Sequence, residues 1–108
     1  MKTTAIKLVA SLVLSVATAV LAQDGALHNY KPPSGYVPDA ETAIRIAVAV
    51  WEPIYGQKQI ATEEPHHATL KGGVWVVEGS LPGGMLGGVA IAEISKSDGT
   101  ILRVSHGR

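Results

Sequence analysis

Residues Val74–Gly107 read VWVVEGSLPGGMLGGVAIAEISKSDGTILRVSHG, and this stretch decides the fold class. Its apolar and β-branched residues fall in three short runs bounded by glycine, proline or polar residues, which is the pattern of β-strands. The Leu81–Gly87 connection holds a proline and three glycines and predicts a flexible loop, whereas Asp98-Gly99 is typical of a tight turn. The three predicted strands cover Val74–Ser80, Gly88–Ser95 and Thr100–His106.

A fourth strand is predicted immediately before this stretch, over His66–Lys71, where the chain follows Pro65. Gly72-Gly73 then supplies two residues that tolerate positive φ, which is the signal for a two-residue β-hairpin. Successive strands joined by short connections pair with their neighbours in most sheets. We therefore expect the four strands to form an antiparallel meander.

The two-residue period of a strand assigns its side chains to two faces. Trp75 and Val77 share the face that we expect to be buried, and Glu78 lies on the opposite, solvated face. If the Glu78 face were the inner one, its carboxylate would be desolvated, as a general base often is. On the last strand, alternation groups Leu102 with Val104, and Ile101 with Arg103 and Ser105.

One helix is predicted, and it begins at Asp39, a residue type that caps helices well. Glu41 lies in the first turn, where the helix dipole favours a negative charge. Only Arg45 interrupts the apolar run that continues to Trp51, and a helix that is apolar nearly all round is normally buried on more than one side. The predicted fold class is therefore α+β, with one buried N-terminal helix packed on a curved four-stranded antiparallel meander.

Pro53 and Gly56 are expected to determine the end of this helix. Proline lacks an N–H and crowds the preceding turn, so the helix should end or kink near Glu52. Gly56 is expected to cap it in a left-handed conformation. A short turn is predicted next, over Gln57–Ile60.

The first 22 residues have the composition of a cleavable signal peptide. Lys2 and Lys7 form a positive n-region, and the apolar run that follows is shorter than the ~20 residues needed to span a bilayer. Small residues fit a signal-peptidase site with cleavage after Ala22. We therefore expect a periplasmic or secreted protein with no stable membrane anchor after cleavage.

Residues 23–38 are rich in proline and glycine and are predicted to form a linker before a domain over residues 39–108. Removing 22 of the 108 residues leaves 86, which carry seven Lys/Arg against nine Asp/Glu and a net charge of −2. This balance argues against a nucleic-acid partner, which requires clustered basic residues. The chain has no cysteine, so the domain must be stabilised by packing without disulfides.

The sequence predicts no catalytic residues, no cofactor and no metal, and therefore a protein that is not an enzyme. Glu63-Glu64-Pro65-His66-His67 contains metal-ligating residue types, but adjacent histidines on a strand point to opposite faces, so we expect a solvated strand entry. Ser105 and His106 also face opposite ways and form no triad. The glycines of Leu81–Gly88 are followed by neither the Lys-Ser/Thr pair nor the helix of a phosphate-binding loop.

The same loop carries Met85 and Leu86. One possibility is that the loop exposes these residues, because flexible apolar residues on a surface often contact a partner. The other is that the loop lies across the end of the sheet. The candidate partner-binding residues are Met85, Leu86, Glu78 and Arg103.

Several spaced blocks of residues carry a family resemblance over about residues 39–108. The blocks are Ala43–Ala47, Trp51–Gly56, Pro65, Leu70–Gly79, Gly87–Ala90 and Ile101–Gly107. Together they resemble the bacterial immunity proteins with a nuclear transport factor 2-like, or cystatin-like, fold. This resemblance implies a cone-like curved sheet around a helix, and a role in neutralising a toxin of bacterial competition systems by binding it. It carries over no catalytic residues.

The expected function is therefore that of an exported, non-enzymatic protein that binds and neutralises a toxin or another periplasmic protein. Two alternatives remain open. One is a self-associating homodimer whose sheets pack together. The other is a small-ligand or enzyme pocket of the ketosteroid-isomerase kind, in which Glu78, Tyr55 and a histidine would converge.

Overall fold

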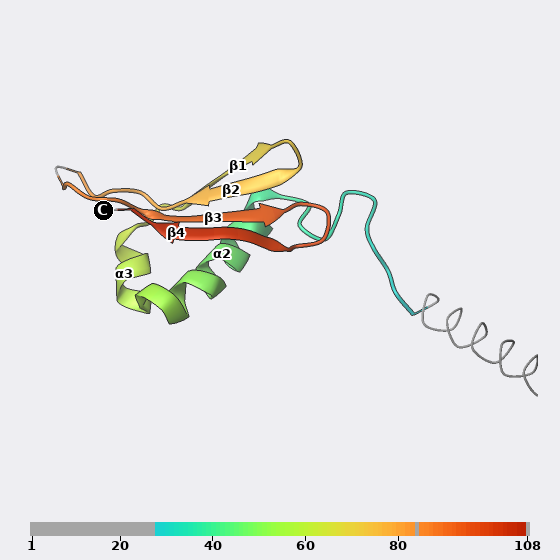
Figure 1. Ribbon diagram of the computed structural model, residues 1–108, viewed down its shortest axis with the longest axis horizontal. Helices are drawn as coiled ribbons and strands as arrows, with labels where there is room; N and C mark the ends of the chain where they lie inside the picture. Colours follow the sequence, from blue (N-terminus) through green and yellow to red (C-terminus); the bar gives the residue numbers. More distant parts are fainter. Residues whose placement is uncertain (1–27, 84, 108) are drawn as a thin grey trace, which may run out of the picture. The chain divides into compact units, whose positions relative to one another are not determined.

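The computed structural model describes residues 28–83 and 85–107 (Figure 1). The predicted signal peptide over residues 1–22 and the first part of the predicted linker lie outside the described residues. The compact unit that contains the helices and the sheet begins at Pro32. None of the helices in the described ranges is long and apolar enough to cross a membrane. The elements follow in the order α2 (Ala40–Tyr55), α3 (Gln57–Thr62), β1 (His67–Lys71), β2 (Val74–Glu78), β3 (Ala90–Ser95) and β4 (Ile101–His106).

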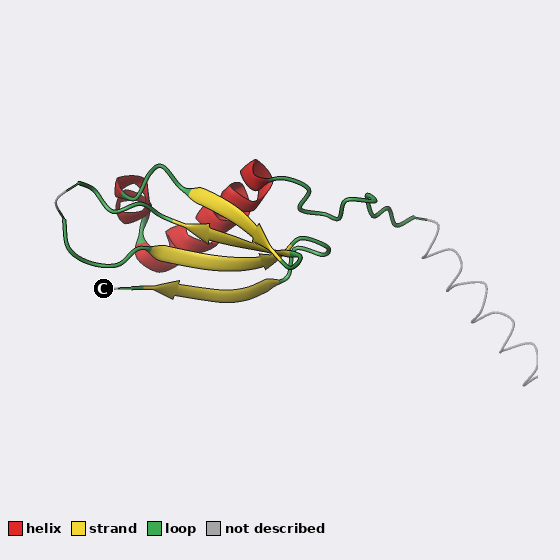
Figure 2. Ribbon diagram, turned by 90° about the horizontal axis from the view of Figure 1, so that it is seen from above, coloured by secondary structure: helices red, strands yellow, loops and turns green. Residues whose placement is uncertain are grey.

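The four strands form one antiparallel sheet in the order β1-β2-β3-β4, which confirms the predicted meander. Each strand lies where it was predicted, with ends one or two residues shorter. Gly72 and Gly73 have φ angles of 55° and 76°, so both central residues of the first hairpin use the positive φ that glycine permits. Both helices lie on the same side of the sheet (Figure 1), and α2 crosses the strands obliquely (Figure 2). The α+β fold class is confirmed.

Helix α2 begins as predicted, with the Asp39 side chain accepting hydrogen bonds from the backbone N–H and the hydroxyl of Thr42 at 2.8 and 2.7 Å. These bonds lower the pKa of Asp39, the bond to the Thr42 side chain most of all. In the next turn, Arg45 donates to Glu41 at 2.7 Å in an exposed ion pair. Acidic residues at this end of a helix also interact favourably with its dipole.

Of the two outcomes predicted for Pro53, an end of the helix near Glu52 is wrong, because α2 continues through the proline to Tyr55. Trp51 is buried and Tyr55 packs against the core, so tertiary contacts on both sides of the proline hold the last turn. Gly56 donates its N–H to the Glu52 carbonyl at 2.8 Å, with φ 96° and ψ 142°. Its φ is positive as expected, but its ψ is extended instead of left-handed helical.

The short turn predicted over Gln57–Ile60 is a six-residue helix, α3, and it extends to Thr62. Ile60 is its buried residue and anchors it to the core. A helix this short has little stability alone, so its packing against the domain accounts for it. Helix α3 places Glu63 directly beside the sheet.

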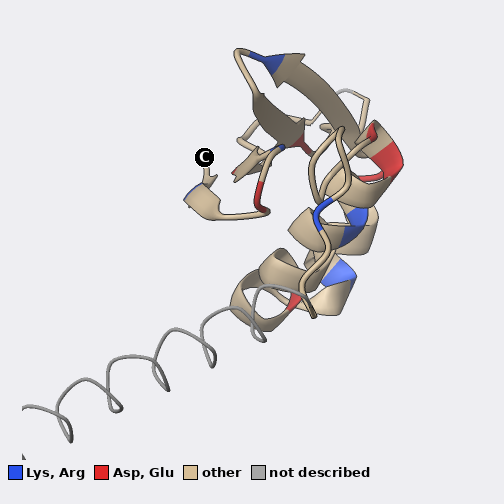
Figure 3. Ribbon diagram, turned by 90° about the vertical axis from the view of Figure 1, so that its right-hand side faces the viewer, with Lys and Arg blue, Asp and Glu red and all other residues tan. Residues whose placement is uncertain are grey.

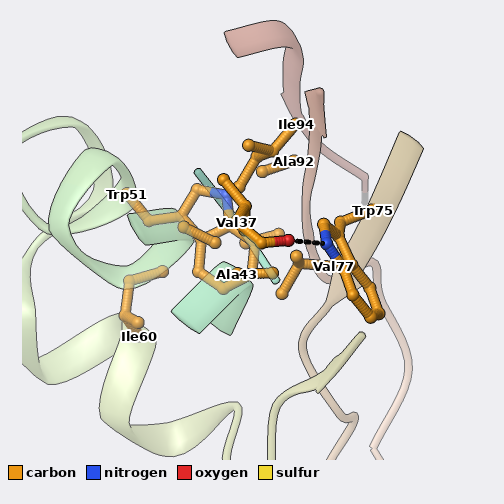
Figure 4. Packing of buried hydrophobic residues seen from close by; sticks show 10 residues of the cluster. Val37, Ala43, Trp51, Ile60, Trp75, Val77, Ala92 and Ile94 are labelled. Carbon is orange, nitrogen blue, oxygen red and sulfur yellow. Dashed lines mark hydrogen bonds between the residues drawn. The ribbon is translucent and has the colours of Figure 1, made fainter. Parts of the chain in front are cut away.

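The core lies between α2 and the inner face of the sheet (Figure 4). Residues four apart on α2 form one fully buried stripe, and alanines in that stripe let the helix approach the strands closely. The flanking Ile44, Ile46 and Val48 are partly buried, while Arg45 and Ala49 remain exposed, so one side of the helix faces solvent. The buried residues are Ala43, Ala47 and Trp51 on α2, Trp75 and Val77 on β2, and Ala90, Ala92 and Ile94 on β3.

A short segment before α2 completes the core. Val37 is buried, and its carbonyl accepts a hydrogen bond from Trp75 Nε1 at 2.8 Å (Figure 4). The N–H groups of Tyr36 and Val37 donate to the Ser97 and Lys96 carbonyls at 3.0 and 3.1 Å. Gly35 has φ +88°, and a Cβ there would collide with the Lys96 backbone oxygen. The last residues of the predicted linker therefore pack against the β3–β4 turn.

A β-bulge changes the predicted faces of β4. Glu93 pairs with Arg103, but the next pair is Ile94 with Ile101, so Leu102 has no partner in the register. Ile101 therefore pairs with a buried residue, while Arg103 donates to Glu93 at 3.1 Å on the outer face. The prediction that Ile101 and Arg103 share a face is wrong, because alternation assumes an uninterrupted pleat.

Acidic and basic residues are interspersed over the described part of the domain (Figure 3).

Candidate functional site

The loop between β2 and β3 extends beyond the end of the sheet (Figure 1). Two of its residues are strongly exposed, Met85 at 61% and Leu86 at 99%. Of the two predicted arrangements, the exposed one is therefore found. When a partner covers an apolar side chain that is fully exposed to water, the free energy of the system falls, so binding is favoured.

A cavity of about 320 Å³ lies between this loop and α3. Polar residues of α3 and the residue after it form one wall, and apolar residues of the loop form the other. The volume is at the lower end of the range for small-molecule sites and could also admit one or two protein side chains. The described residues that line it are Gln59, Thr62, Glu63, Ser80, Leu81, Pro82, Met85, Leu86 and Gly88.

Glu63 is a buried carboxylate on which several segments converge, and only 2% of the residue is exposed. Its Oε1 accepts from the backbone N–H of Ala90 at 2.6 Å. Its Oε2 accepts from Gln59 Nε2 at 2.9 Å and faces His106 Nε2 at 2.7 Å. Its backbone carbonyl accepts from the Ser80 N–H at 2.6 Å. One residue thus joins α3 to both ends of the loop and to the end of β4.

Gly79 leaves the space that Glu63 occupies. A Cβ at position 79 would lie 2.6 Å from Glu63 Oε1 and 2.9 Å from Glu63 Cβ. The Gly79 N–H also donates to the Ala90 carbonyl at 3.0 Å. The close approach of backbone to a buried carboxylate therefore requires glycine at this position.

His106 has an oxygen acceptor at each ring nitrogen. Its Nε2 lies 2.7 Å from Glu63 Oε2, and its Nδ1 lies 2.7 Å from the Gly107 carbonyl oxygen. Because neither acceptor carries a hydrogen when Glu63 is ionised, both contacts are hydrogen bonds only when both ring nitrogens are protonated. The ring also packs against Tyr55, with centroids 5.0 Å apart. The geometry is that of an imidazolium facing a carboxylate.

The pKa shifts agree with this ion pair. The hydrogen bond to Glu63 raises the pKa of His106 above its ordinary value, and the bond to Gly107 adds to the effect, while burial opposes it. Burial acts to raise the pKa of Glu63, but the hydrogen bonds from Ala90, Gln59 and His106 together outweigh it. The pKa of Glu63 therefore lies below its ordinary value. Both groups are charged in the pH range between the two shifted values.

The four predicted partner-binding residues fall into two groups. Met85 and Leu86 lie together at the rim of the cavity. Glu78 and Arg103 are exposed on the outer face of the sheet, where Arg103 forms its ion pair with Glu93. The predicted solvated position of Glu78 is confirmed.

The convergence of Glu78, Tyr55 and a histidine is not found. Tyr55 does meet His106, but the carboxylate beside that histidine is Glu63. Glu78 lies on the opposite face of β2 from the buried Trp75 and Val77.

The expectation of a solvated strand entry over residues 63–67 is wrong for Glu63. The other members of this segment differ: Glu64 and His67 are exposed, while His66 Nε2 lies 3.0 Å from the Ile60 carbonyl oxygen. The His66 ring also meets Trp51 edge-on at 5.5 Å. Within the described ranges, no three His, Cys, Asp or Glu residues are grouped so as to hold a metal ion.

Sequence reasoning missed the Glu63–His106 pair because its partners are distant along the chain. Glu63 is 27 positions from Ala90 and 43 from His106. The only local signal was Gln59, four residues before Glu63, which places both side chains on one helical face.

A family model described as NTF2 fold immunity protein matches residues 42–108, well over half of the chain. The chain belongs to the NTF2 fold immunity protein family. The family resemblance noted in the sequence is thereby confirmed, and the helix followed by a four-stranded antiparallel sheet is consistent with an NTF2-like fold. Gln59, Glu63, Ala90 and His106 all lie within the matched residues of this immunity-protein domain.

Two proteins of Escherichia coli (strain K12) are similar to this immunity-family chain. The uncharacterized protein YhhH is 37% identical over 73 residues, which cover 67% of this chain and 58% of YhhH. The uncharacterized protein YbbC is 37% identical over 67 residues, which cover 61% of this chain and 55% of YbbC. The chain therefore spans little more than half the length of these curated relatives. No solved structure matches it.

Proposed function

We propose that this protein is an exported, non-enzymatic immunity protein that neutralises a bacterial toxin by binding it directly. The observation that carries the proposal is the family match over residues 42–108, which supports a role in toxin immunity. The residues that resemble a signal peptide support export, so the toxin would act in the periplasm or reach it from outside.

The loop beside the cavity is the proposed contact surface. Leu86 is almost completely exposed and Met85 is mostly so, next to a cavity of about 320 Å³. Methionine adapts to differently shaped partners, and a few apolar anchors usually supply most of the binding energy of an interface. A side chain of the toxin would enter the cavity, while Met85 and Leu86 would contact the toxin surface around that side chain.

The state of the buried carboxylate supports a non-enzymatic role. Both oxygens of Glu63 are engaged by groups of the same chain. The hydrogen bonds that hold it also lower the pKa of Glu63 despite its burial, whereas a general base near neutral pH needs a higher value. The carboxylate that borders the cavity is therefore suited to holding the fold together and poorly suited to proton transfer.

A capture experiment with two leucine variants tests the proposal. The full chain is immobilised and incubated with periplasmic extract, in parallel with Leu86→Ser and the matched control Leu102→Ser. Leu102 is also an exposed leucine, but it lies on β4, away from the loop. We expect the wild type and the Leu102 variant to capture one partner protein in stoichiometric amount. The Leu86 variant should bind that partner with an affinity lower by about 30-fold.

Neutralisation is tested next with the captured protein. When that protein is produced in the periplasm of a sensitive strain, it should arrest growth, and co-production of the wild type should restore growth where Leu86→Ser does not. Equal capture by both leucine variants would contradict the proposed surface. A homodimer on size-exclusion chromatography with no foreign partner would favour self-association over immunity.

A further inference from the structure

Both ends of the proposed contact loop are hydrogen-bonded to residues of one partly buried ion pair, Glu63–His106, or to their chain neighbours. We propose that the Glu63–His106 pair is a protonation-dependent latch that holds the two ends of the loop, at Ser80 and at Val89, and thereby makes binding by this loop sensitive to pH. The part of this inference that concerns binding rests on the proposed function, whereas the part that concerns the loop does not.

The first attachment is at the loop entry. The Ser80 N–H donates to the Glu63 carbonyl at 2.6 Å, and the Ser80 hydroxyl donates to the Pro65 carbonyl at 2.5 Å. Both acceptors belong to the short connection between α3 and β1. The position of the loop entry therefore depends on the position of Glu63 and its neighbour.

The second attachment is at the loop exit. The Ala90 N–H donates to Glu63 Oε1 at 2.6 Å, and the Gly107 N–H donates to the Val89 carbonyl at 3.2 Å. Gly107 adjoins His106, whose ring bonds to the other oxygen of the same carboxylate. The exit is thus held by the two residues of the ion pair, one through its side chain and the other through its backbone neighbour.

Loss of the proton from His106 breaks this arrangement. With both ring nitrogens protonated, the ring donates to Glu63 Oε2 and to the Gly107 carbonyl, each at 2.7 Å. A neutral ring has only one N–H, so one bare nitrogen must face an oxygen and one hydrogen bond is lost. The Glu63 carboxylate is then left buried beside a neutral group, which favours an outward movement of the segments it holds.

The groups that face this pair in the described part of the chain do not replace the missing charge. Tyr55 of α2 contributes ring contact to His106, and Gln59 of α3 donates a neutral amide N–H to Glu63. From β3, the backbone N–H of Ala90 donates to the Glu63 carboxylate. The latch is therefore closed while both Glu63 and His106 are charged, and opens as pH rises through the titration of the histidine.

Hydrogen exchange of the full chain, with no partner present, tests the latch. Protection of the Ser80 and Ala90 amides is measured at about pH 6, below the ordinary histidine pKa, and at about pH 9, well above it, and is corrected for intrinsic rates. We expect protection at both amides to fall by about tenfold or more at the higher pH, the effect of losing a hydrogen bond to a charged group. The buried Val77 amide within β2 should stay better protected than either loop-end amide at both pH values, because it opens only with the whole domain.

Two substitutions assign the effect to one histidine. His106→Gln keeps an N–H donor toward Glu63 but cannot titrate, so loop protection should become independent of pH. His67→Gln removes an exposed histidine of β1 and should retain the wild-type response. Unchanged wild-type protection at the two pH values would overturn the latch, as would a full response in His106→Gln.

An NMR titration of the wild type keeps the test independent of any variant that folds poorly. Protection at Ser80 and Ala90 must fall between the ordinary histidine pKa and the folded-state titration midpoint of the His106 ring, and a loss that begins only above that midpoint overturns the proposal. The link to binding is tested separately by repeating the capture experiment at both pH values. Capture that weakens at the higher pH for wild type but not for His106→Gln supports it. Equal wild-type capture at both values, with a loosened loop, overturns only the link to binding and leaves the immunity function standing.

Discussion

Replacing Glu63 with alanine should destabilise the domain by about 3–5 kcal/mol. The first contribution comes from Ala90, whose buried N–H loses its acceptor, at a cost of about 1–3 kcal/mol. The second is the charge-assisted bond from His106, worth about 1.5–3 kcal/mol. Gln59 is exposed, so water can replace its lost hydrogen bond at little cost.

This loss is large for a domain of this size. The unit that begins at Pro32 should have a total stability of roughly 4–12 kcal/mol, so the alanine variant would lose about a quarter of it or more. Glu63→Gln should be milder, at about 1–2 kcal/mol, because its carbonyl oxygen can still accept from Ala90 while the charge is absent.

Equilibrium urea unfolding at neutral pH, followed by the fluorescence of the buried Trp51 and Trp75, measures these differences. The exposed neighbour Glu64 supplies the matched control, and Glu64→Ala should change stability by less than about 0.5 kcal/mol. A cost below about 1 kcal/mol for Glu63→Ala, or an equal cost for Glu64→Ala, would refute the assignment of Glu63 as a structural hub.

Three further predictions concern the core, the turns and pH. Trp75→Phe keeps an aromatic ring but removes the Nε1 donor to a buried carbonyl, so urea unfolding should show a loss of about 1–3 kcal/mol, and a loss below about 0.5 would contradict the bond. Gly35→Ala should lower the melting temperature more than Gly72→Ala, since both glycines have positive φ but only a Cβ at position 35 meets backbone; the reverse order in thermal melts would contradict this. The pKa of His106 is raised above 6.5, so its contribution to stability is complete below that pH and is lost as pH rises through the folded-state value. The pKa of Glu63 is lowered below 4.5, so its contribution to stability is present above that pH and is lost as pH falls through the folded-state value. Stability should therefore be highest between the folded-state pKa of Glu63 and that of His106. Urea denaturation midpoints that stay constant from about pH 6 to about pH 9 would argue against the ion pair.

The features that could be predicted from the sequence are those set by neighbouring residues. Asp39 caps α2 through Thr42, three positions away, and Gly72-Gly73 closes a hairpin between adjacent strands. Alternation along β2 placed Trp75 and Val77 on one face, and in the structure this face is the buried one. In each case the physical cause lies within a few residues, so a local pattern was sufficient.

The features that were missed depend on distant contacts. The bulge at Leu102 arises from pairing with β3, and α2 continues past Pro53 because Trp51 and Tyr55 pack against the core. Glu63 was assigned to solvent because nothing near it in sequence shows that Ala90 and His106 would surround it. Met85 and Leu86 were predicted as candidates from composition alone, and the cavity beside them became visible only in three dimensions.

The hydrogen bond from Trp75 to Val37 has a consequence for how fragments of this protein should be cut. The family match begins at residue 42, yet the carbonyl that satisfies the buried indole belongs to Val37, and the cap of α2 belongs to Asp39. A fragment trimmed to the matched residues would lose both. The shortest autonomously folding piece should therefore begin at Pro32, ten residues before homology alone would place its boundary.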